Sequence, residues 1–97
     1  MEFKIKKTKK FDTWLKQLKD RKAVLNILQR IDRASLGNFG DHEPVGSGVY
    51  EMRVHIGPGY RVYYTIRNNK IIFLLQGGNK STQKKDINKA KTLAKNI

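Results

Sequence analysis

Apolar and polar residues alternate near the start of the chain, and this alternation predicts the first element. Within residues 1–8, Phe3 and Ile5 stand between charged neighbours, so that every second side chain is apolar. A period of two is typical of a half-buried strand. We therefore expect a short strand here that pairs with a longer one.

After residue 8 the period changes to that of two amphipathic helices. The first apolar stripe consists of Phe11, Trp14, Leu15 and Leu18, and the second consists of Val24, Leu25, Leu28 and Ile31. Thr8 and Asp20 precede the two stripes as candidate N-caps, and Gly37 suits the left-handed position after the second helix. The pattern thus predicts a helical hairpin whose apolar stripes pack on a core.

Residues 38–47 contain Pro44 and several polar turn-forming residues, and we expect them to form the longest loop. Beyond them, the turn signals Gly57-Pro58-Gly59 and Asn68-Asn69 separate three β-branched and aromatic runs. This arrangement predicts a three-stranded antiparallel meander.

The turn lengths predict the register of that meander. A three-residue first turn pairs Ile56 with Tyr60, Val54 with Val62, Met52 with Tyr64, His55 with Arg61 and Arg53 with Tyr63. A two-residue second turn pairs Ile66 with Ile71, Tyr64 with Phe73 and Val62 with Leu75. One face is then apolar and lies under the helical hairpin, whereas the other is mixed.

The mixed face is expected to lie partly under a C-terminal helix. Ile72 and Leu74 need cover on that face, and residues 82–97 provide a weakly amphipathic helix with lysines on its outer side. Residues 1–97 therefore read as a single α+β domain in the order β-α-α-β-β-β-α, with a small antiparallel, mixed-edge sheet.

Charge and composition restrict the function classes. The chain has 21 Lys and Arg against 8 Asp and Glu, a net charge of +13 and no cysteine. An excess of this size favours an anionic partner, most simply nucleic acid, although an acidic protein also fits. The lack of cysteine excludes disulfides and thiolate ligands, and no apolar run is long enough for a membrane span. We expect a cytoplasmic protein that uses no metal or other cofactor.

The candidate site lies on the mixed face of the meander. Arg53 and Arg61 are expected close together there, and adjacent cations repel unless they share an anion. The anion is either a ligand phosphate or the carboxylate of Glu51. His55, opposite Arg61, is a candidate for proton transfer, because a neighbouring cation favours its neutral form, but it also fits a surface histidine.

Further basic and aromatic residues extend this candidate site. Residues 77–81 lead from a strand into a helix, so their amides could hold a phosphate or simply turn the chain. The lysine runs at residues 4–10 and 80–95 fit either solvated faces or polyanion contacts. We expect contacts with nucleic acid from Tyr63, Arg67, Lys84 and Lys85.

Three segments together resemble a known family. Residues 49–55 (VYEMRVH), 57–64 (GPGYRVYY) and 77–87 (GGNKSTQKKDI) are similar to the addiction-module killer, HigB-like branch of the RelE/ParE toxin superfamily. The predicted order of elements is also that of this superfamily. The resemblance implies a toxin of a type II toxin–antitoxin system, which either cuts messenger RNA on the ribosome, as RelE and HigB types do, or poisons DNA gyrase, as ParE types do.

The resemblance also implies roles for individual residues. Arg61 matches an arginine that stabilises the reacting phosphate in RelE-like toxins, and Arg53 and Lys80 match basic positions nearby. Glu51 stands where RelE has a lysine, and Asp86 stands near the position of a C-terminal tyrosine in RelE. The resemblance therefore assigns neither the general base nor the general acid. His55 could act there, as histidines do in HigB-type toxins.

The chemistry of RNA cleavage supports these catalytic candidates, Arg61, Arg53, His55 and Lys80. Attack by the 2′-hydroxyl requires its deprotonation, stabilisation of the phosphorane charge and protonation of the leaving 5′-oxygen, all of which arginine and histidine can provide without a metal. The leading hypothesis is a ribosome-dependent, metal-independent messenger-RNA endoribonuclease. A gyrase inhibitor and a non-catalytic nucleic-acid-binding module are the alternatives.

The resemblance further implies a partner. A toxin needs a cognate antitoxin, which in this branch is a small helix-turn-helix DNA-binding protein, and the charge of +13 favours an acidic segment on it. Promoter DNA would be bound only indirectly, through that antitoxin.

Overall fold

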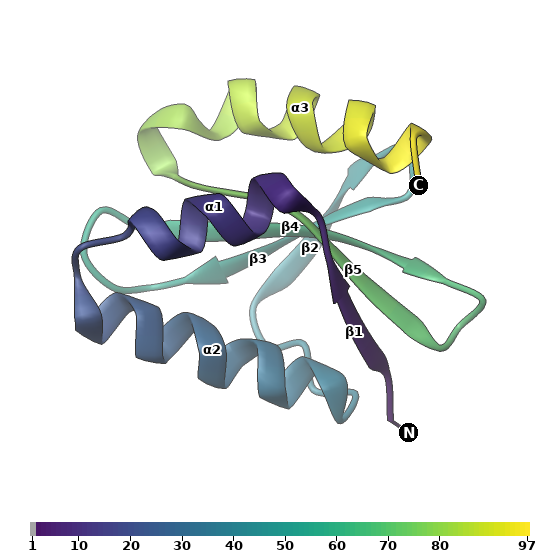
Figure 1. The fold of residues 1–97 in the computed structure, drawn as a ribbon, viewed down its shortest axis with the longest axis horizontal. Coiled ribbons are helices and arrows are strands. Elements are labelled where there is room, and N and C mark those ends of the chain that lie inside the picture. Colours follow the sequence, from purple (N-terminus) through teal and green to yellow (C-terminus); the bar gives the residue numbers. More distant parts are fainter. Residues whose placement is uncertain (1) are drawn as a thin grey trace.

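A five-stranded sheet lies between α3 on one face and the α1–α2 hairpin on the other (Figure 1). The computed structural model describes residues 2–97. Its elements are β1 (Lys4–Lys7), α1 (Lys9–Gln17), α2 (Arg21–Ser35), β2 (His42–Gly46), β3 (Val49–Val54), β4 (Tyr60–Arg67), β5 (Ile71–Asn79), a 3-10 turn (Lys80–Thr82) and α3 (Gln83–Lys95). The strand order is β1-β5-β4-β3-β2, with β1 parallel to β5 and the other neighbours antiparallel. The predicted α+β class is confirmed.

The sheet has one strand more than the sequence pattern predicts. The segment His42–Gly46, which we expected to be loop, pairs with β3 as an edge strand. Pro44 is compatible with this position because an edge strand has one side on which no amide needs a partner. The turn residues of the segment hide the strand from a pattern-based prediction. At the other edge, the expected strand over 1–8 is confined to β1, and Met1 lies outside the described residues.

The helical hairpin begins at the two predicted caps. The side chain of Thr8 accepts a hydrogen bond from the amide of Phe11, and that of Asp20 accepts one from the amide of Ala23. Each cap satisfies an amide that has no partner within the helix. Phe11 is buried in the core between the hairpin and the sheet, and Trp14 packs against that core.

The buried face of α2 shares only Ile31 with the predicted stripe. Leu25 and Leu28 are 60% and 43% exposed, whereas the buried residues of the helix are Ala23, Ile27, Ile31 and Ala34. Small alanines let the helix approach the sheet closely, and Arg30 on the same side binds the Arg53 carbonyl. Packing against the sheet thus selects this face and leaves the two leucines outside.

The register of β3 and β4 is shifted by two residues from the prediction. Val54 pairs with Tyr60 and Arg53 pairs with Arg61. The connection therefore spans residues 55–59, in which Gly57 and Gly59 have positive φ angles of 56° and 78°. A shift of two residues keeps every side chain on its predicted face.

The register of β4 and β5 is shifted by one residue, which exchanges the faces. Arg67 pairs with Ile71, so the turn has three residues, and both asparagines in it have positive φ. Ile72 and Leu74 consequently face the helical hairpin, contrary to the prediction, and Phe73 lies under α3. Leu75 also lies under α3, contrary to the prediction, and the bulge beside it returns Gln76 to the predicted, mixed face.

α3 covers the second face, as predicted, although over partly different side chains. A small cluster of Val49, Tyr63, Leu75, Ala90 and Ala94 is buried beneath it, while Ile97 is exposed. On the opposite face Trp14 lies directly over Gly77, where an added Cβ would stand 2.1 Å from the ring. Within residues 2–97, no helix has the length and apolar character needed to cross a membrane.

Candidate active site

Two arginines and a glutamate lie together on the α3 side of the sheet. Arg53 on β3 is the direct cross-strand neighbour of Arg61 on β4, and Glu51 is the neighbour of Tyr63. His55 lies beyond the end of β3 rather than opposite Arg61, so that part of the predicted arrangement is wrong. The two adjacent cations that the sequence predicts are nevertheless present.

Glu51 is the anion that the two arginines share. Its carboxylate is fully buried, with Oε1 3.2 Å from Arg61 Nε and Oε2 3.0 Å from Arg53 Nη1. Oε1 also accepts hydrogen bonds from the Tyr63 hydroxyl at 3.2 Å and from Gln83 Nε2 at 2.7 Å. A buried carboxylate with this many donors is held in one position. It hydrogen-bonds Arg53 and pairs with Arg61 by charge alone, because the Arg61 Nε–H has no hydrogen-bond partner among residues 2–97.

Arg53 is engaged by carboxylates on all sides. Besides Glu51 it binds Glu43 at 2.7 Å and Asp41, which accepts from Nη2 at 3.1 Å and from Nε at 3.3 Å. The pKa of the Arg53 guanidinium is raised, first by Asp41 and then by Glu43. Arg53 in turn lowers the pKa of Asp41 to about 2, with a smaller contribution from His55. In this state the Arg53 side chain organises the site and offers no free nitrogen.

The loop that carries Asp41 is tied to the body of the protein by Arg30. This side chain donates to the carbonyls of Arg53, Phe39 (3.0 Å) and Asp41 (3.3 Å). Gly40 has a positive φ of 62°, and a Cβ there would stand 2.7 Å from Arg30 Nη2. A glycine therefore lets the loop lie against the arginine that anchors it.

Arg61 keeps part of its guanidinium available. Its side chain is 11% exposed, and Nη1 donates to the carbonyl of Gly59 at 3.0 Å. Lys80 approaches the same place, because a Cβ on Gly59 would stand 3.5 Å from Arg61 Nη1 and 3.6 Å from Lys80 Cβ. Lys80 is exposed and forms no ion pair within residues 2–97. Arg61 and the base of the Lys80 side chain thus flank Gly59 at the end of the sheet.

His55 has a carboxylate as its charged partner. Its Nε2 lies 2.5 Å from Asp41 Oδ2, and its side chain is 72% exposed. Expecting it beside the Arg61 cation was wrong, because the predicted register was displaced by two residues. The ring is nevertheless open to solvent next to the arginine cluster, and Asp41 holds its orientation.

The residues expected to contact nucleic acid divide into two groups. Tyr63 is fully buried, and burial raises its pKa, so it has no free ring face and serves instead to hold Glu51. Arg67 donates to the carbonyl of Ala94 at 2.7 Å, near the end of α3. Lys84 and Lys85, by contrast, are exposed on the first turn of α3.

A second buried carboxylate, that of Asp86, lies in the first turn of α3. Asp86 accepts a hydrogen bond from Thr82 at 2.5 Å and one from Gln76 Nε2 at 3.3 Å. It lies against Gly78, where an added Cβ would stand 1.8 Å from Asp86 Oδ2. Gly78 therefore has a packing role: it lets the start of α3 lie on β5.

Sequence reasoning missed three residues of this cluster. Asp41 and Glu43 belong to the segment assigned to a loop, and their contacts with Arg53 span 12 and 10 positions. Gln83 reaches Glu51 across 32 positions. The sequence has no local signal for these three residues. It does indicate that Glu51 belongs to a charge cluster, because a glutamate in an apolar strand requires a cationic partner when it is buried.

The local charge of this cluster differs from that of the whole chain. Three carboxylates, those of Asp41, Glu43 and Glu51, surround two guanidinium groups. The surplus of positive charge lies next to them, on Lys80 and on the exposed lysines at the start of α3. An anion is therefore attracted to the Arg61–Lys80 side of the cluster rather than to Arg53.

Comparisons with known proteins agree with this fold. Residues 13–96 match the family described as "Phage derived protein Gp49-like (DUF891)". An uncharacterized protein of Haemophilus influenzae (strain ATCC 51907 / DSM 11121 / KW20 / Rd) is 47% identical over 97 residues, which cover 100% of this chain and 98% of that one. A mutant of the E. coli toxin RelE in the free state, in which two arginines are replaced by alanine, superposes with a TM-score of 0.76 at 13% identity. The superposition covers 100% of this chain and 99% of the other. The chain therefore belongs to the Gp49-like family of phage-derived proteins, and it adopts the RelE fold.

Proposed function

We propose that the protein is the toxin of a toxin–antitoxin pair, of the HigB-like type, and that it cuts messenger RNA on the ribosome without a metal ion. The observation that carries this proposal is the placement of Arg61. Its guanidinium forms an ion pair with the buried Glu51 carboxylate and lies across Gly59 from the exposed Lys80. Family membership and the RelE fold support a toxin of this class.

In this mechanism Arg61 and Lys80 bind the phosphate that reacts. The attack of a 2′-hydroxyl adds negative charge to the phosphate oxygens, and a guanidinium that is already in position stabilises this charge without reorganising. Glu51 keeps Arg61 in position, and Arg53 helps to hold Glu51. Arg53 is thus a positioning residue in this proposal, with Arg61 and Lys80 contacting the substrate.

His55 is the proposed proton carrier: it takes the proton of the attacking 2′-hydroxyl, and the 5′-oxygen takes a proton from water as its bond to phosphorus breaks. When the ring is neutral and its Nε2 proton points at Asp41, Nδ1 is left as an acceptor that can take the proton of a 2′-hydroxyl. Asp41 would select this tautomer and orient the ring. The conservative change Asp41→Asn tests this, because it should lower the rate and alter its pH profile while leaving RNA affinity unchanged.

The experiment is to map new 5′ ends on a defined messenger RNA in a purified translation system. We compare the wild type, Arg61→Gln and the charge-matched control Arg33→Gln, which changes an exposed arginine of α2. Cuts that require ribosomes, persist in the control and vanish in Arg61→Gln are expected. Intact RNA with a folded, growth-inhibiting wild type would refute the nuclease and leave gyrase inhibition as the hypothesis to test.

An antitoxin is the partner that this function requires, and the helical hairpin offers a surface for it. A groove of about 660 Å³ is lined by Leu15, Lys16, Leu18, Lys19, Arg21, Val24 and Leu25. Its apolar floor and cationic rim are complementary to an amphipathic helix with acidic residues. We propose that a helix-turn-helix antitoxin binds here through such a segment and carries the complex to promoter DNA.

A further inference from the structure

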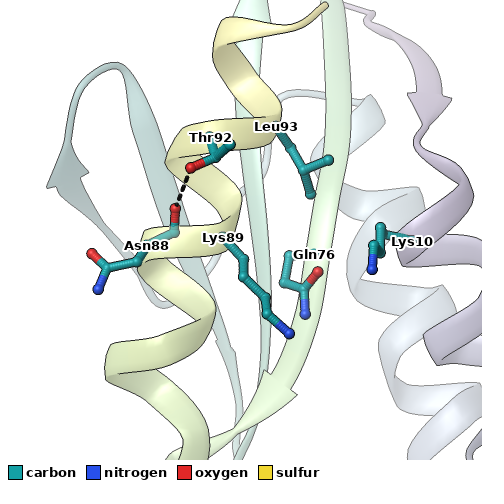
Figure 2. Close-up of a pocket in the computed structure, with 6 residues that line it drawn as sticks. All are labelled: Lys10, Gln76, Asn88, Lys89, Thr92 and Leu93. Carbon is teal, nitrogen blue, oxygen red and sulfur yellow. Dashed lines mark hydrogen bonds between the residues drawn. The ribbon is translucent and has the colours of Figure 1, made fainter.

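A groove separates α1 from α3 on the side of the molecule where β5 forms its floor. One cavity of about 320 Å³ is lined by Lys10, Gln76, Asn88, Lys89, Thr92 and Leu93, and these side chains are drawn in Figure 2. An adjoining cavity of about 430 Å³ shares Lys10, Gln76 and Lys89 and extends along α1 past Trp14. The proposed cleavage residues do not line this groove.

The groove joins the two lysine runs of the sequence. Lys9 and Lys10 come from the start of α1, and Lys89 comes from the middle of α3, almost 80 residues later. In Figure 2 the Lys89 side chain extends from α3 to the Gln76 amide, and Lys10 lies on the other side of Gln76. All three lysines are exposed, and in the part of the chain that the structure describes they form no ion pair. A positive potential therefore acts on the groove from both walls.

The floor of the groove contains an acceptor without a donor. Gln76 Nε2 donates to Asp86 Oδ1 and to the carbonyl of Gly77, both at 3.3 Å. Both oxygens of the buried Asp86 accept hydrogen bonds in this structure, so an amide turned over would place Gln76 Oε1 against Asp86 Oδ1. Gln76 Oε1 is therefore fixed in orientation, and it is buried without a hydrogen-bond partner among residues 2–97. A buried carbonyl of this kind needs a donor.

We propose that this groove binds one nucleotide of an RNA strand outside the scissile bond. A phosphate fits between Lys10 and Lys89, and an N–H group of the base donates to Gln76 Oε1. Leu93 supplies apolar surface for the base. A free phosphate offers Gln76 only a hydroxyl and has nothing to cover Leu93, whereas a nucleotide provides a charge, an N–H donor and the face of a base. The choice of RNA as the ligand rests on the proposed function.

The test measures the affinity of the full-length protein for a fluorescent, 2′-O-methylated RNA dodecamer, which cannot be cleaved through its 2′-hydroxyls. The variant Lys10→Gln/Lys89→Gln is compared with Lys22→Gln/Lys70→Gln, which removes the same charge from exposed positions outside the groove. The groove variant is expected to bind about ten-fold more weakly than this control, because it forms fewer charge-assisted hydrogen bonds with the phosphate. The slope of log K against log salt concentration should also be shallower for the groove variant than for this control, by about 0.7 for each phosphate that the variant no longer binds.

A second variant tests the base contact separately from the charge. Gln76→Met should weaken binding without changing the salt slope, and circular dichroism checks that the fold is retained. The nucleotide could come from single-stranded or from base-paired RNA. A comparison of the single strand with a hairpin RNA of the same composition distinguishes the two, because paired bases have no free N–H on their pairing edge. Binding that favours the single strand is expected.

Two results would overturn the proposal. One is equal affinity and equal salt slope for the groove variant and its control. The other is equal affinity of the wild type and Gln76→Met for the single strand. The RNA is not cleaved in this assay, so the binding result does not depend on nuclease activity. Failure of the nuclease proposal at Arg61 would be seen separately, in the cleavage experiment.

Discussion

The buried carboxylate of Glu51 is predicted to be a main determinant of both stability and site geometry. The test is Glu51→Gln, which keeps the size of the side chain and removes its charge. The amide oxygen of this variant could still accept from the Tyr63 hydroxyl, but the Arg61 guanidinium would be left without its only anion within the described residues. Arg53 would keep Asp41 and Glu43.

The magnitude follows from burial. Glu51 has no exposed surface and Arg61 is 11% exposed, and breaking a buried pair of this kind by removing one charge costs about 3 to 5 kcal/mol. The retained hydrogen bonds place Glu51→Gln at the lower end, at about 3 kcal/mol. In a domain of this size that lowers the melting temperature by about 12 to 24 °C.

The matched control is Glu43→Gln. Glu43 lies 2.7 Å from the same arginine as Glu51 but is 54% exposed, so its removal should cost about 0 to 1 kcal/mol. Urea unfolding followed by Trp14 fluorescence measures both variants. Equal midpoints for the two variants would refute the reasoning, since burial is the feature that distinguishes the two carboxylates.

Three further predictions concern the rest of the molecule. Gly77→Ala should destabilise the fold by about 1 to 3 kcal/mol or more, because the new Cβ would stand 2.1 Å from the Trp14 ring, and thermal unfolding would show it. The Asp41 carboxyl should titrate near pH 2 in the folded protein and nearer pH 4 in Arg53→Gln, which a carbonyl-detected NMR titration can follow. Because the pKa of Asp41 is lower in the folded than in the unfolded protein, its contribution to stability is present above about pH 4 and is lost as the pH falls toward 2. Leu25→Lys should weaken antitoxin binding about ten-fold or more in calorimetry while leaving the unfolding midpoint unchanged, because this leucine is 60% exposed in the free protein.

Features that depend on neighbouring residues were predictable from the sequence. The caps Thr8 and Asp20 bind amides three positions away, so the local pattern contains all the information needed. The position of α3 over the mixed face also follows from apolar side chains that require cover. Arg53 and Arg61 were also predictable as neighbours on one face, because a register error of two residues leaves every side chain on the same face of a strand.

Features that depend on turn length or on packing were not predictable. The three-residue turn before Ile71 and the bulge at Leu75 decide which side of the sheet each β5 residue faces, and neither has an unambiguous local signal. On α2, both the leucine stripe and the alanine–isoleucine stripe have helical spacing. Only the approach of the helix to the sheet selects the second of these.

The composition of the site shows the same division. The resemblance of local segments points to Arg61 and Lys80 as candidates, and the structure places both beside Gly59. The engagement of Arg53 by Asp41 and Glu43 depends on an edge strand that the turn-rich segment conceals. The sequence therefore indicates the cations of the site but not the carboxylates that orient them.

The most direct test of the central claim is the single-turnover rate of messenger-RNA cleavage on the ribosome, for wild type, Arg61→Gln and Arg61→Lys. If Arg61 stabilises the reacting phosphate, Arg61→Gln lowers the rate by about 10² to 10³, with the RNA still bound. Arg61→Lys keeps the charge beside Glu51 and should recover only part of that loss, because it lacks the planar fork. Cleavage by folded Arg61→Gln at the wild-type rate would contradict the account.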